Sequence, residues 1–386
     1  MPLPDYTGGQ KLRPHRSVME AILREANFSD CPAIAAVKDR NGMPDEPWDW
    51  LWRENPALTA FPADFPLGWV IQCGDSIVGY LGNVPLVYYW EGKPLRSAVA
   101  RGFAVDPEFR SHSIRLAAAF LSQKGVPLLL NTSANVPTSA IFGALKAAKI
   151  PQNDYDRALY WVVRPAGFLA SACRRMGLPG SLAHIAGLMF SPVLYAEMKL
   201  RRRQPSETSG PIVVEKIEPQ QAGGDFDAFW HRTLRDRPRC LLADRSAAVL
   251  RWRYGHAKAA ARHATLFIAR RAGGVSGYAV VTRENSPGIG LNRSRVVDLI
   301  AEDDEGSVID HLLAAAHEYA RRDGSHIMEL IGFPERIRRR VIAGNPLVRR
   351  LPSWEFWYKT VDPDLAQSLV KPESWYGSPF DGDASL

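Results

Sequence analysis

The chain has 386 residues, 46% hydrophobic and 23% charged, which is the composition of an ordinary globular protein with length for two cores. Its 48 Lys and Arg against 41 Asp and Glu give a net charge of +7, which favours anionic partners without selecting one. Scattered cysteines, no export signal and no apolar run of roughly 18 residues exclude a disulfide scaffold and a spanning helix, so we expect a reduced, cytoplasmic protein.

The first half of the chain alternates strand-like and helical segments. Residues 1–16 contain two early prolines and a basic cluster and are predicted to form a loosely held arm, and 17–165 are predicted to form a mixed α/β domain. A Gly-Asp turn pair between two apolar runs predicts a hairpin over 68–85. The pattern then predicts a second hairpin over 86–105, a helix over 113–123, a strand over 128–131, a helix over 138–149 and a closing strand over 155–163.

An apolar helical segment follows over 166–210, ending in a linker rich in Pro, Ser and Gly. Its cations include Arg174, Arg175, Lys199 and the run 201–203. Two interpretations fit residues 166–203. The favoured one is a helical pair packed between two domains, and the alternative is an amphipathic helix in contact with an anionic membrane or an assembly partner.

The pattern of the first half returns over 211–386, which indicates an internal repeat. Gly79-Tyr80 recurs as Gly277-Tyr278, and Leu116 with three alanines recurs as Leu313 with three alanines, a separation of 197 (313 − 116). A nearly constant spacing through strand, turn and helix is typical of duplication. We therefore expect an α/β (α+β) fold of two similar domains in tandem, each a mixed twisted sheet flanked by helices.

The residues after the strand that ends at Val105 have the chemistry of a phosphate-binding turn. The run V-D-P-E-F-R-S-H-S-I-R at 105–115 enters a helix, which directs N–H groups and the positive end of the helix dipole at one point. With the L-A-A-A-F-L that follows, it resembles the coenzyme A loop of the GNAT acyltransferase superfamily, V-x-P-x-x-R followed by R/Q-x-x-G-x-G/A. Arg110 matches the first loop position, whereas Ser113 and Arg115 replace the glycines that let the backbone approach phosphates.

The resemblance implies tandem GNAT domains, an acetyl- or other acyl-coenzyme A co-substrate and no metal. Ser113 and Arg115 then either weaken binding or supply hydroxyl and guanidinium donors to the phosphates. The run L-L-L-N at 128–131, with Asn135 after it, resembles the region that holds the pantetheine arm. The residues implied to bind the cofactor are Phe103, Ala104, Val105, Arg110, Ser111, His112, Ser113, Ile114, Arg115, Asn131 and Asn135.

In the second half, acidic residues stand at the positions equivalent to the loop after Val105 in the first half. The run E-D-D-E at 302–305 would repel phosphates, and Ser307 stands in the place of Arg110, so this half resembles a GNAT domain that has lost its cofactor loop. We interpret these acids as a solvated helix start, with Asp298 the best exception because it lies within the strand.

Two further segments are rich in aromatic residues. Residues 244–254, dense in Arg and aromatic residues, form either a groove, together with Phe229-Trp230, for a sugar, nucleotide or phosphate, or a helix with core aromatics and solvated arginines. The ending 375–383 is predicted to dock back on the fold.

Acyl transfer of this kind needs strand N–H groups that polarise the thioester carbonyl and a base or water chain that deprotonates the acceptor. Glu108 and His112 lie near the loop, Tyr155 is a candidate acid for the leaving thiolate, and Asp298 is a candidate if the halves share one cleft. For each, a structural role is the favoured interpretation. The sequence contains no metal-ligand spacing, no G-x-S-x-G elbow and no phosphate-binding P-loop.

Three classes of function remain. The first is an acyl-coenzyme A-dependent N- or O-acyltransferase with a small-molecule acceptor. The second resembles the Fem-type aminoacyltransferases, which take the acyl group from aminoacyl-tRNA. It ranks lower because the chain lacks a coiled-coil arm with sustained heptads, and only here do we expect a nucleic acid partner. The third is a non-catalytic ligand- or partner-binding pair of domains.

Overall fold

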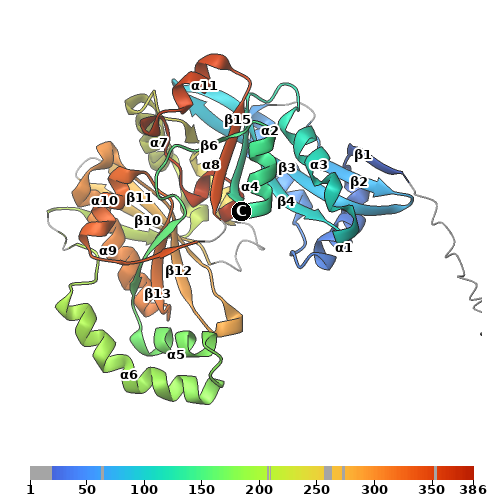
Figure 1. Cartoon of the computed structure of the whole chain (residues 1–386). Helices are drawn as coiled ribbons and strands as arrows, with labels where there is room; N and C mark the ends of the chain where they lie inside the picture. Colours follow the sequence, from blue (N-terminus) through green and yellow to red (C-terminus); the bar gives the residue numbers. More distant parts are fainter. Residues whose placement is uncertain are drawn as a thin grey trace, which may run out of the picture.

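The computed structural model describes residues 20–61, 65–206, 208, 210–255, 263–271, 274–351 and 354–386. The predicted arm at 1–16 lies outside these residues. Two mixed sheets with helices packed against them form the framework (Figure 1), which confirms the predicted fold class.

The first sheet has eight strands in the order β1-β2-β3-β4-β5-β15-β6, with β9 paired to β3. Its β4 and β5 pair in parallel, and its other neighbouring strands pair antiparallel. Glu91 and Gly92 join β3 to β4 with φ of 51° and 72°, so the two predicted hairpins are three consecutive antiparallel strands. The strands of this sheet are β1 (Ala21–Glu25), β2 (Gly68–Cys73), β3 (Ser76–Trp90), β4 (Lys93–Val105), β5 (Leu128–Ala134), β6 (Ala148–Lys149), β9 (Leu242–Ala243) and β15 (Glu355–Thr360).

The second sheet has seven strands in the order β14-β7-β13-β12-β11-β10-β8. Here β12 and β13 are the parallel pair. The strands are β7 (Arg157–Val162), β8 (Val213–Ile217), β10 (Thr265–Arg271), β11 (Gly274–Arg283), β12 (Arg293–Ala301), β13 (Ile327–Ile331) and β14 (Leu347–Arg350).

The two sheets repeat one plan, and each takes the strand beside its parallel pair from the other half of the chain, while the first sheet also receives β9 from the second half. Reading β1 against β8, β2 against β10, β3 against β11, β4 against β12 and β5 against β13 gives the same order, as an internal repeat produces. The predicted closing strand of the first domain, over 155–163, does not join the first sheet. It forms β7 and pairs antiparallel with β13, whereas β15 from the far end of the chain pairs with β5. Because both sheets offer the same edge, the local pattern cannot distinguish them.

The helices pack mainly on the faces of these sheets, and α3 buries Leu116, Ala117, Phe120 and Leu121. The predicted helix over 138–149 ends earlier, at Ala144, and Lys146 then takes a left-handed φ of 59°. The helices are α1 (Cys31–Arg40), α2 (Pro56–Ala60), α3 (Ser113–Leu121), α4 (Val136–Ala144), α5 (Pro165–Arg175), α6 (Gly180–Leu200), α7 (Gly224–Asp236), α8 (Ala247–Gly255), α9 (Gly306–Arg322), α10 (Glu335–Ala343) and α11 (Pro363–Leu369).

The helices α5 and α6 form a hairpin at one end of the second sheet. Figure 1 shows this hairpin below β12 and β13 and away from the first sheet, so the favoured interpretation of a pair packed between two domains is wrong. Its two helices pack closely against each other, because a Cβ on Gly187 of α6 would lie 2.5 Å from the Ala166 carbonyl oxygen of α5. Among the described helices, none has the length and apolar character to cross a membrane.

A shared core joins the two halves. The largest cluster of buried apolar side chains contains residues from both. Trp50 and Trp252 link them directly, because each indole N–H donates to the other residue's carbonyl oxygen, at 2.7 and 2.9 Å. The halves are therefore packed as one body.

Candidate functional site

The parallel strands β4 and β5 diverge after a short contact. Their register runs from Ser97 opposite Leu128 to Val99 opposite Leu130, after which β4 continues to Val105 and β5 to Ala134. A cavity of about 120 Å³ opens between the diverging ends, and we call this space the first cleft. The lining side chains and backbone include Arg101, Gly102, Phe103, Asn131, Asn135 and Asp383.

Strand β4 bulges where it borders this cavity. One β3 residue, Leu81, lies between the positions that oppose Arg101 and Ala104, whereas β4 has two residues there, Gly102 and Phe103. Gly102 takes a φ of 66°, which suits glycine, and a Cβ at this position would lie 3.2 Å from Glu46 Oε1. The bulge takes its N–H groups out of the regular ladder and places them beside the cavity. Such groups are the donors that polarise a carbonyl oxygen.

A buried charge cluster supports the bulge. Arg101 Nε donates to Glu46 Oε2 at 2.9 Å, and Lys38 forms an ion pair with the same carboxylate. Burial raises the pKa of Glu46, but the charges of Arg101 and Lys38 outweigh it and hold the pKa below its usual value. Glu46 therefore stays ionised between Arg101 and Lys38, and the three charged side chains hold the bulge in place.

Asp383 contributes a carboxylate to the lining of the first cleft. It accepts hydrogen bonds from Thr132 Oγ1 at 2.8 Å and from Ser133 Oγ at 2.8 and 2.9 Å, and Arg101 Nη1 donates to its backbone oxygen at 3.0 Å. Sequence reasoning missed this residue. The only signal was the aromatic tail, predicted to dock back on the fold, and its docking is confirmed because Trp375, Tyr376 and Phe380 are buried.

The structure brings the predicted cofactor-binding residues to one end of the first sheet, in three groups. Phe103, Asn131 and Asn135 line the cavity. Asn135 also caps α4, because its Oδ1 accepts from Thr138 N at 3.0 Å. Ala104 and Val105 are buried in the ladder opposite Tyr80 and Gly79.

The third group lies on the loop between β4 and α3. Arg110, Ser111 and His112 belong to the 3-10 helix η3 (Pro107–His112), and Ser113, Ile114 and Arg115 form the first turn of α3. Arg110 is exposed. Arg115 is held at the start of β1, since its Nη1 donates to the Ala21 carbonyl oxygen at 2.9 Å and lies 3.0 Å from His112 Nδ1. The geometry therefore favours Arg110 over Arg115 as the guanidinium that meets a phosphate.

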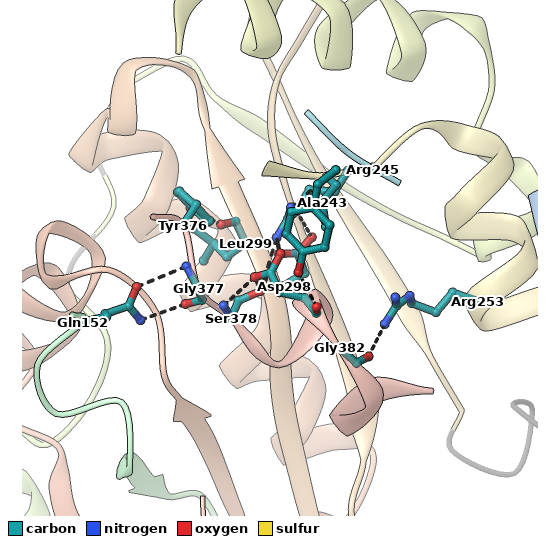
Figure 2. A network of polar contacts seen from close by, with 12 residues as sticks. Gln152, Ala243, Arg245, Arg253, Asp298, Leu299, Tyr376, Gly377, Ser378 and Gly382 are labelled. Atoms are coloured by element: carbon teal, nitrogen blue, oxygen red, sulfur yellow. Dashed lines mark hydrogen bonds and ion pairs between the residues drawn. The ribbon is translucent and has the colours of Figure 1, made fainter. Parts of the chain in front are cut away.

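The equivalent space in the second sheet, which we call the second cleft, contains the chain's own C-terminal segment. β12 and β13 pair from Arg293 opposite Ile327 to Val296 opposite Leu330, and β12 then continues to Ala301. Tyr376 OH donates to the Leu299 carbonyl oxygen in this divergent part, and Phe333 N donates to the Gly377 oxygen at 3.0 Å. Figure 2 shows this segment against β12.

Asp298 lies at the centre of a buried network in the second cleft (Figure 2). Its carboxylate accepts from Arg245 Nε at 3.0 Å, from Ser378 Oγ at 3.2 Å and from Tyr278 OH. Arg245 also binds Asp381 at 3.0 Å and is fully buried. These contacts use the Asp298 carboxylate for packing and give it a structural role.

Both interpretations of residues 244–254 need correction. Arg245 and Arg253 are buried, so this segment neither lines an open groove nor carries these two arginines in solvent. Each guanidinium lies over the ring of Phe380, at 4.6 Å for Arg245 and 4.3 Å for Arg253, and Arg253 Nη1 donates to the Gly382 oxygen at 3.0 Å. Both arginines therefore hold the C-terminal segment in place.

Three of the four acids at 302–305 are paired with arginines, so the expected solvated helix start describes only part of their environment. Asp304 binds Arg237 at 2.8 Å and also Arg336, and Glu302 lies 3.4 Å from Arg232. Both Asp303 and Asp304 take left-handed φ values, of 49° and 52°. The backbone here differs from that of η3 in the first half.

The catalytic candidates Glu108, Tyr155 and Asp298 do not meet in the first cleft. Glu108 is exposed on η3, Asp298 is buried in the second cleft, and Tyr155 is buried with its OH 3.4 Å from the Ser378 carbonyl oxygen. Burial raises the pKa of Tyr155 well above its ordinary value. No group of His, Cys, Asp and Glu among the described residues has the arrangement of a metal site.

Comparison with known proteins finds solved structures of similar architecture. No family model and no curated protein matches the sequence. A GCN5-related N-acetyltransferase from Anabaena variabilis is 10% identical with a TM-score of 0.53, over 89% of this chain and 73% of that chain. One from Kribbella flavida is 11% identical with a TM-score of 0.54, over 89% and 72%. Eis1 from Mycobacterium abscessus is 12% identical with a TM-score of 0.51, over 91% and 76%. With its diverging parallel strands, bulged β4 and repeated sheet plan, the chain therefore has the fold of the GNAT-type N-acyltransferase superfamily.

Proposed function

We propose that this protein transfers an acyl group from acyl-coenzyme A to an amine or hydroxyl of a small-molecule acceptor, in the first cleft and in the cytoplasm. The observation that carries the proposal is the cavity between β4 and β5, with the bulge at Gly102 on one wall and Asn131 and Asn135 on the other. The structural neighbours named as N-acetyltransferases share this fold, but a fold alone does not specify an activity, and the residues of the site support it.

The proposal assigns the cofactor to the first half for two physical reasons. Arg110 is exposed on the loop that leads from β4 into α3, where a guanidinium can bind a phosphate. In the second half, Tyr376 and the residues after it occupy the space between β12 and β13, and carboxylates stand at the loop. Arginines there are already paired with these carboxylates, so they are not free to bind a pyrophosphate.

The proposed reaction needs one proton to move from the acceptor to the thiolate. N–H groups of the β4 bulge polarise the thioester carbonyl, and the acceptor's nitrogen or oxygen forms the new bond to the carbonyl carbon. Asp383 takes the proton that the acceptor loses. The carbon–sulfur bond then breaks, and the protonated Asp383 returns the same proton to the coenzyme A sulfur, so that atoms and charge balance.

Ligand binding is the first test. Acetyl-coenzyme A at about a hundred times its dissociation constant should stabilise the protein by roughly 2.7 kcal/mol and raise its Tm by several degrees. Absence of a shift at millimolar ligand removes the proposal and leaves the fold untouched. A protein that instead binds aminoacyl-tRNA, and not acetyl-coenzyme A, belongs to the Fem-type alternative.

Asp383 is tested by Asp383→Asn, which keeps the shape that accepts from Thr132 and Ser133. With a panel of amines, release of free coenzyme A thiol should fall by roughly 10²-fold to 10⁴-fold, while calorimetric affinity for acetyl-coenzyme A stays the same. Equal thiol release by the variant and the parent protein excludes Asp383 as the base. A fall in both turnover and affinity indicates that the carboxylate only supports the cleft.

A further inference from the structure

The outer side of α6 carries apolar side chains that the fold leaves exposed. Leu182, Ile185, Met189 and Val193 recur three or four residues apart and so share one side of the helix, with exposed fractions of 54%, 52%, 70% and 68%. Leu200 at the end of the helix is 86% exposed. We call these five residues the α6 stripe. Within α6, only Ala183 and Gly187 are buried, so the fold uses a narrow side of this helix.

A continuous apolar stripe of this kind marks an interaction surface, because single exposed apolar residues are common whereas a full helix side is not. The surrounding charge identifies the partner. Residues 165–203 contain six Arg and Lys and one acid, Glu197, a net charge of +5 (6 − 1). Arg175 is exposed just before α6 begins, and Lys199, Arg201 and Arg202 are exposed where it ends.

The hairpin also borders a cationic groove. A cavity of about 940 Å³ lies between α6, the end of β7 and α9. Arg164, Lys199, Arg203 and Arg321 line it, with Glu318 as the carboxylate among them. Val162, Pro192 and Met198 supply apolar lining next to these cations. Basic and apolar surface therefore adjoin at the start of α5 and the C-terminal half of α6.

These features fit an anionic lipid bilayer better than other occupants. A second copy docked through the same stripe would bring two segments of net positive charge together, which is unfavourable. A nucleic acid would satisfy the cations and leave the α6 stripe in water. An interfacial helix, by contrast, places its apolar side at the acyl boundary while flanking Lys and Arg bind anionic head groups.

We propose that the α5–α6 hairpin is a peripheral membrane-binding element that inserts the α6 stripe into the surface of an anionic bilayer. The helix lies in the plane of the interface and does not cross the membrane. This proposal stands independently of the acyltransferase activity, because it uses no residue of the first cleft.

The test is sedimentation of the full chain with vesicles of phosphatidylcholine alone or mixed with phosphatidylglycerol. We expect binding to the mixed vesicles, decreasing with added salt, and little binding to the neutral ones. Met189→Glu combined with Val193→Glu should lower the partition coefficient by at least about tenfold, since two charges enter the apolar boundary. Val361→Glu is the matched control, because Val361 is 67% exposed but lies outside the hairpin, and it should bind as the parent protein does.

The contribution of charge is measured separately. Arg175→Gln and Arg202→Gln should each lower the partition coefficient by about fivefold, and Arg339→Gln, at an exposed position on α10, should leave it unchanged. Absence of binding to mixed vesicles, or equal binding by the parent protein and the Met189→Glu, Val193→Glu variant, overturns the proposal. So does a dimer in light scattering that this double variant converts to a monomer, because the α6 stripe is then a contact between copies.

Discussion

The first and second clefts occupy the same position in two sheets of the same strand order. The first contains an open cavity, and the second contains the C-terminal segment of the chain. The first cleft is a cavity between β4 and β5 beside a glycine bulge, and Arg110 is exposed on the loop that follows β4. Between β12 and β13 lie Tyr376 and the following residues, held by Arg245 and Asp298. The same order of strands therefore leaves a cavity in one copy and is filled by the chain's own packing in the other. The loop after β4 or β12 and the C-terminal segment make this difference.

The largest expected effect tests the packing of the second cleft. Arg245→Ala leaves Asp298 and Asp381 buried without their shared cation, and should lower the free energy of unfolding by about 3 to 5 kcal/mol in urea denaturation. Arg339→Ala breaks an exposed pair with Glu335 and should change it by less than about 0.5 kcal/mol. A small effect at Arg245 contradicts the structural role of the second cleft.

The second largest expected effect tests which cleft binds the cofactor. Arg110→Ala should weaken acetyl-coenzyme A binding by roughly ten-fold to a hundred-fold in calorimetry, because a charge-assisted contact to phosphate contributes about 1.5 to 3 kcal/mol. Ser307→Ala, at the equivalent position, should leave affinity unchanged. The reverse result, with affinity lost at Ser307 and kept at Arg110, places the site in the second half.

A smaller effect is expected at the bulge. Gly102→Ala forces an L-residue into a φ of 66°, which costs roughly 1 to 2 kcal/mol of backbone strain. Its Cβ would also lie 3.2 Å from Glu46 Oε1, so the variant should lose more stability than the strain alone predicts. Gly92→Ala is the matched control, since its φ is 72° and nothing lies within 4 Å of the new Cβ. Only Gly102→Ala should also weaken acetyl-coenzyme A binding. Equal ligand affinity in the two variants separates the bulge from the site.

The smallest effect is a pH dependence that belongs to the second half. Burial raises the pKa of Glu329, but the charges of Arg295, Arg293 and Arg349 outweigh it and lower the pKa. A lowered pKa means that this stabilisation is present above the unfolded value of about 4.3 and is lost as the pH falls through the folded value. Urea midpoints between neutral pH and acid should therefore fall less steeply for Glu329→Gln than for the parent protein. Parallel curves contradict the assignment, and exposed Glu335→Gln serves as the control.

Much of the fold was predictable because apolar runs, turn pairs and the 197-residue repeat are local properties of the sequence. The hairpin over 68–85 and the helix after Val105 follow directly from them. The position of β7 was not predictable, since its pairing with β13 depends on residues far along the chain. The burial of Arg245 and Arg253 was not predictable either. An arginine-rich helix is expected to face solvent unless its acidic and aromatic partners are known.

The candidate site was predictable to the same degree. Phe103, Asn131 and Asn135 were found because the resemblance to the superfamily follows the strands that carry them. Asp383 was not found, because it enters the first cleft from the far end of the chain. Its role depends on a tertiary contact with Thr132 and Ser133, 251 and 250 positions away, which no local pattern reports.

The exchange of β7 and β15 has a consequence for how this protein acquires its structure. Each sheet is completed only by a strand from the other half, so neither half, expressed alone, has all the strands of its sheet. Pairs such as Leu159 with Leu330 and Leu130 with Tyr358 span long stretches of chain, and contacts of such separation slow the folding of a domain. During synthesis β5 must remain without its partner until residues 355–360 emerge, which leaves an exposed edge open to aggregation or to swapping between copies. Melting should accordingly occur as one cooperative transition.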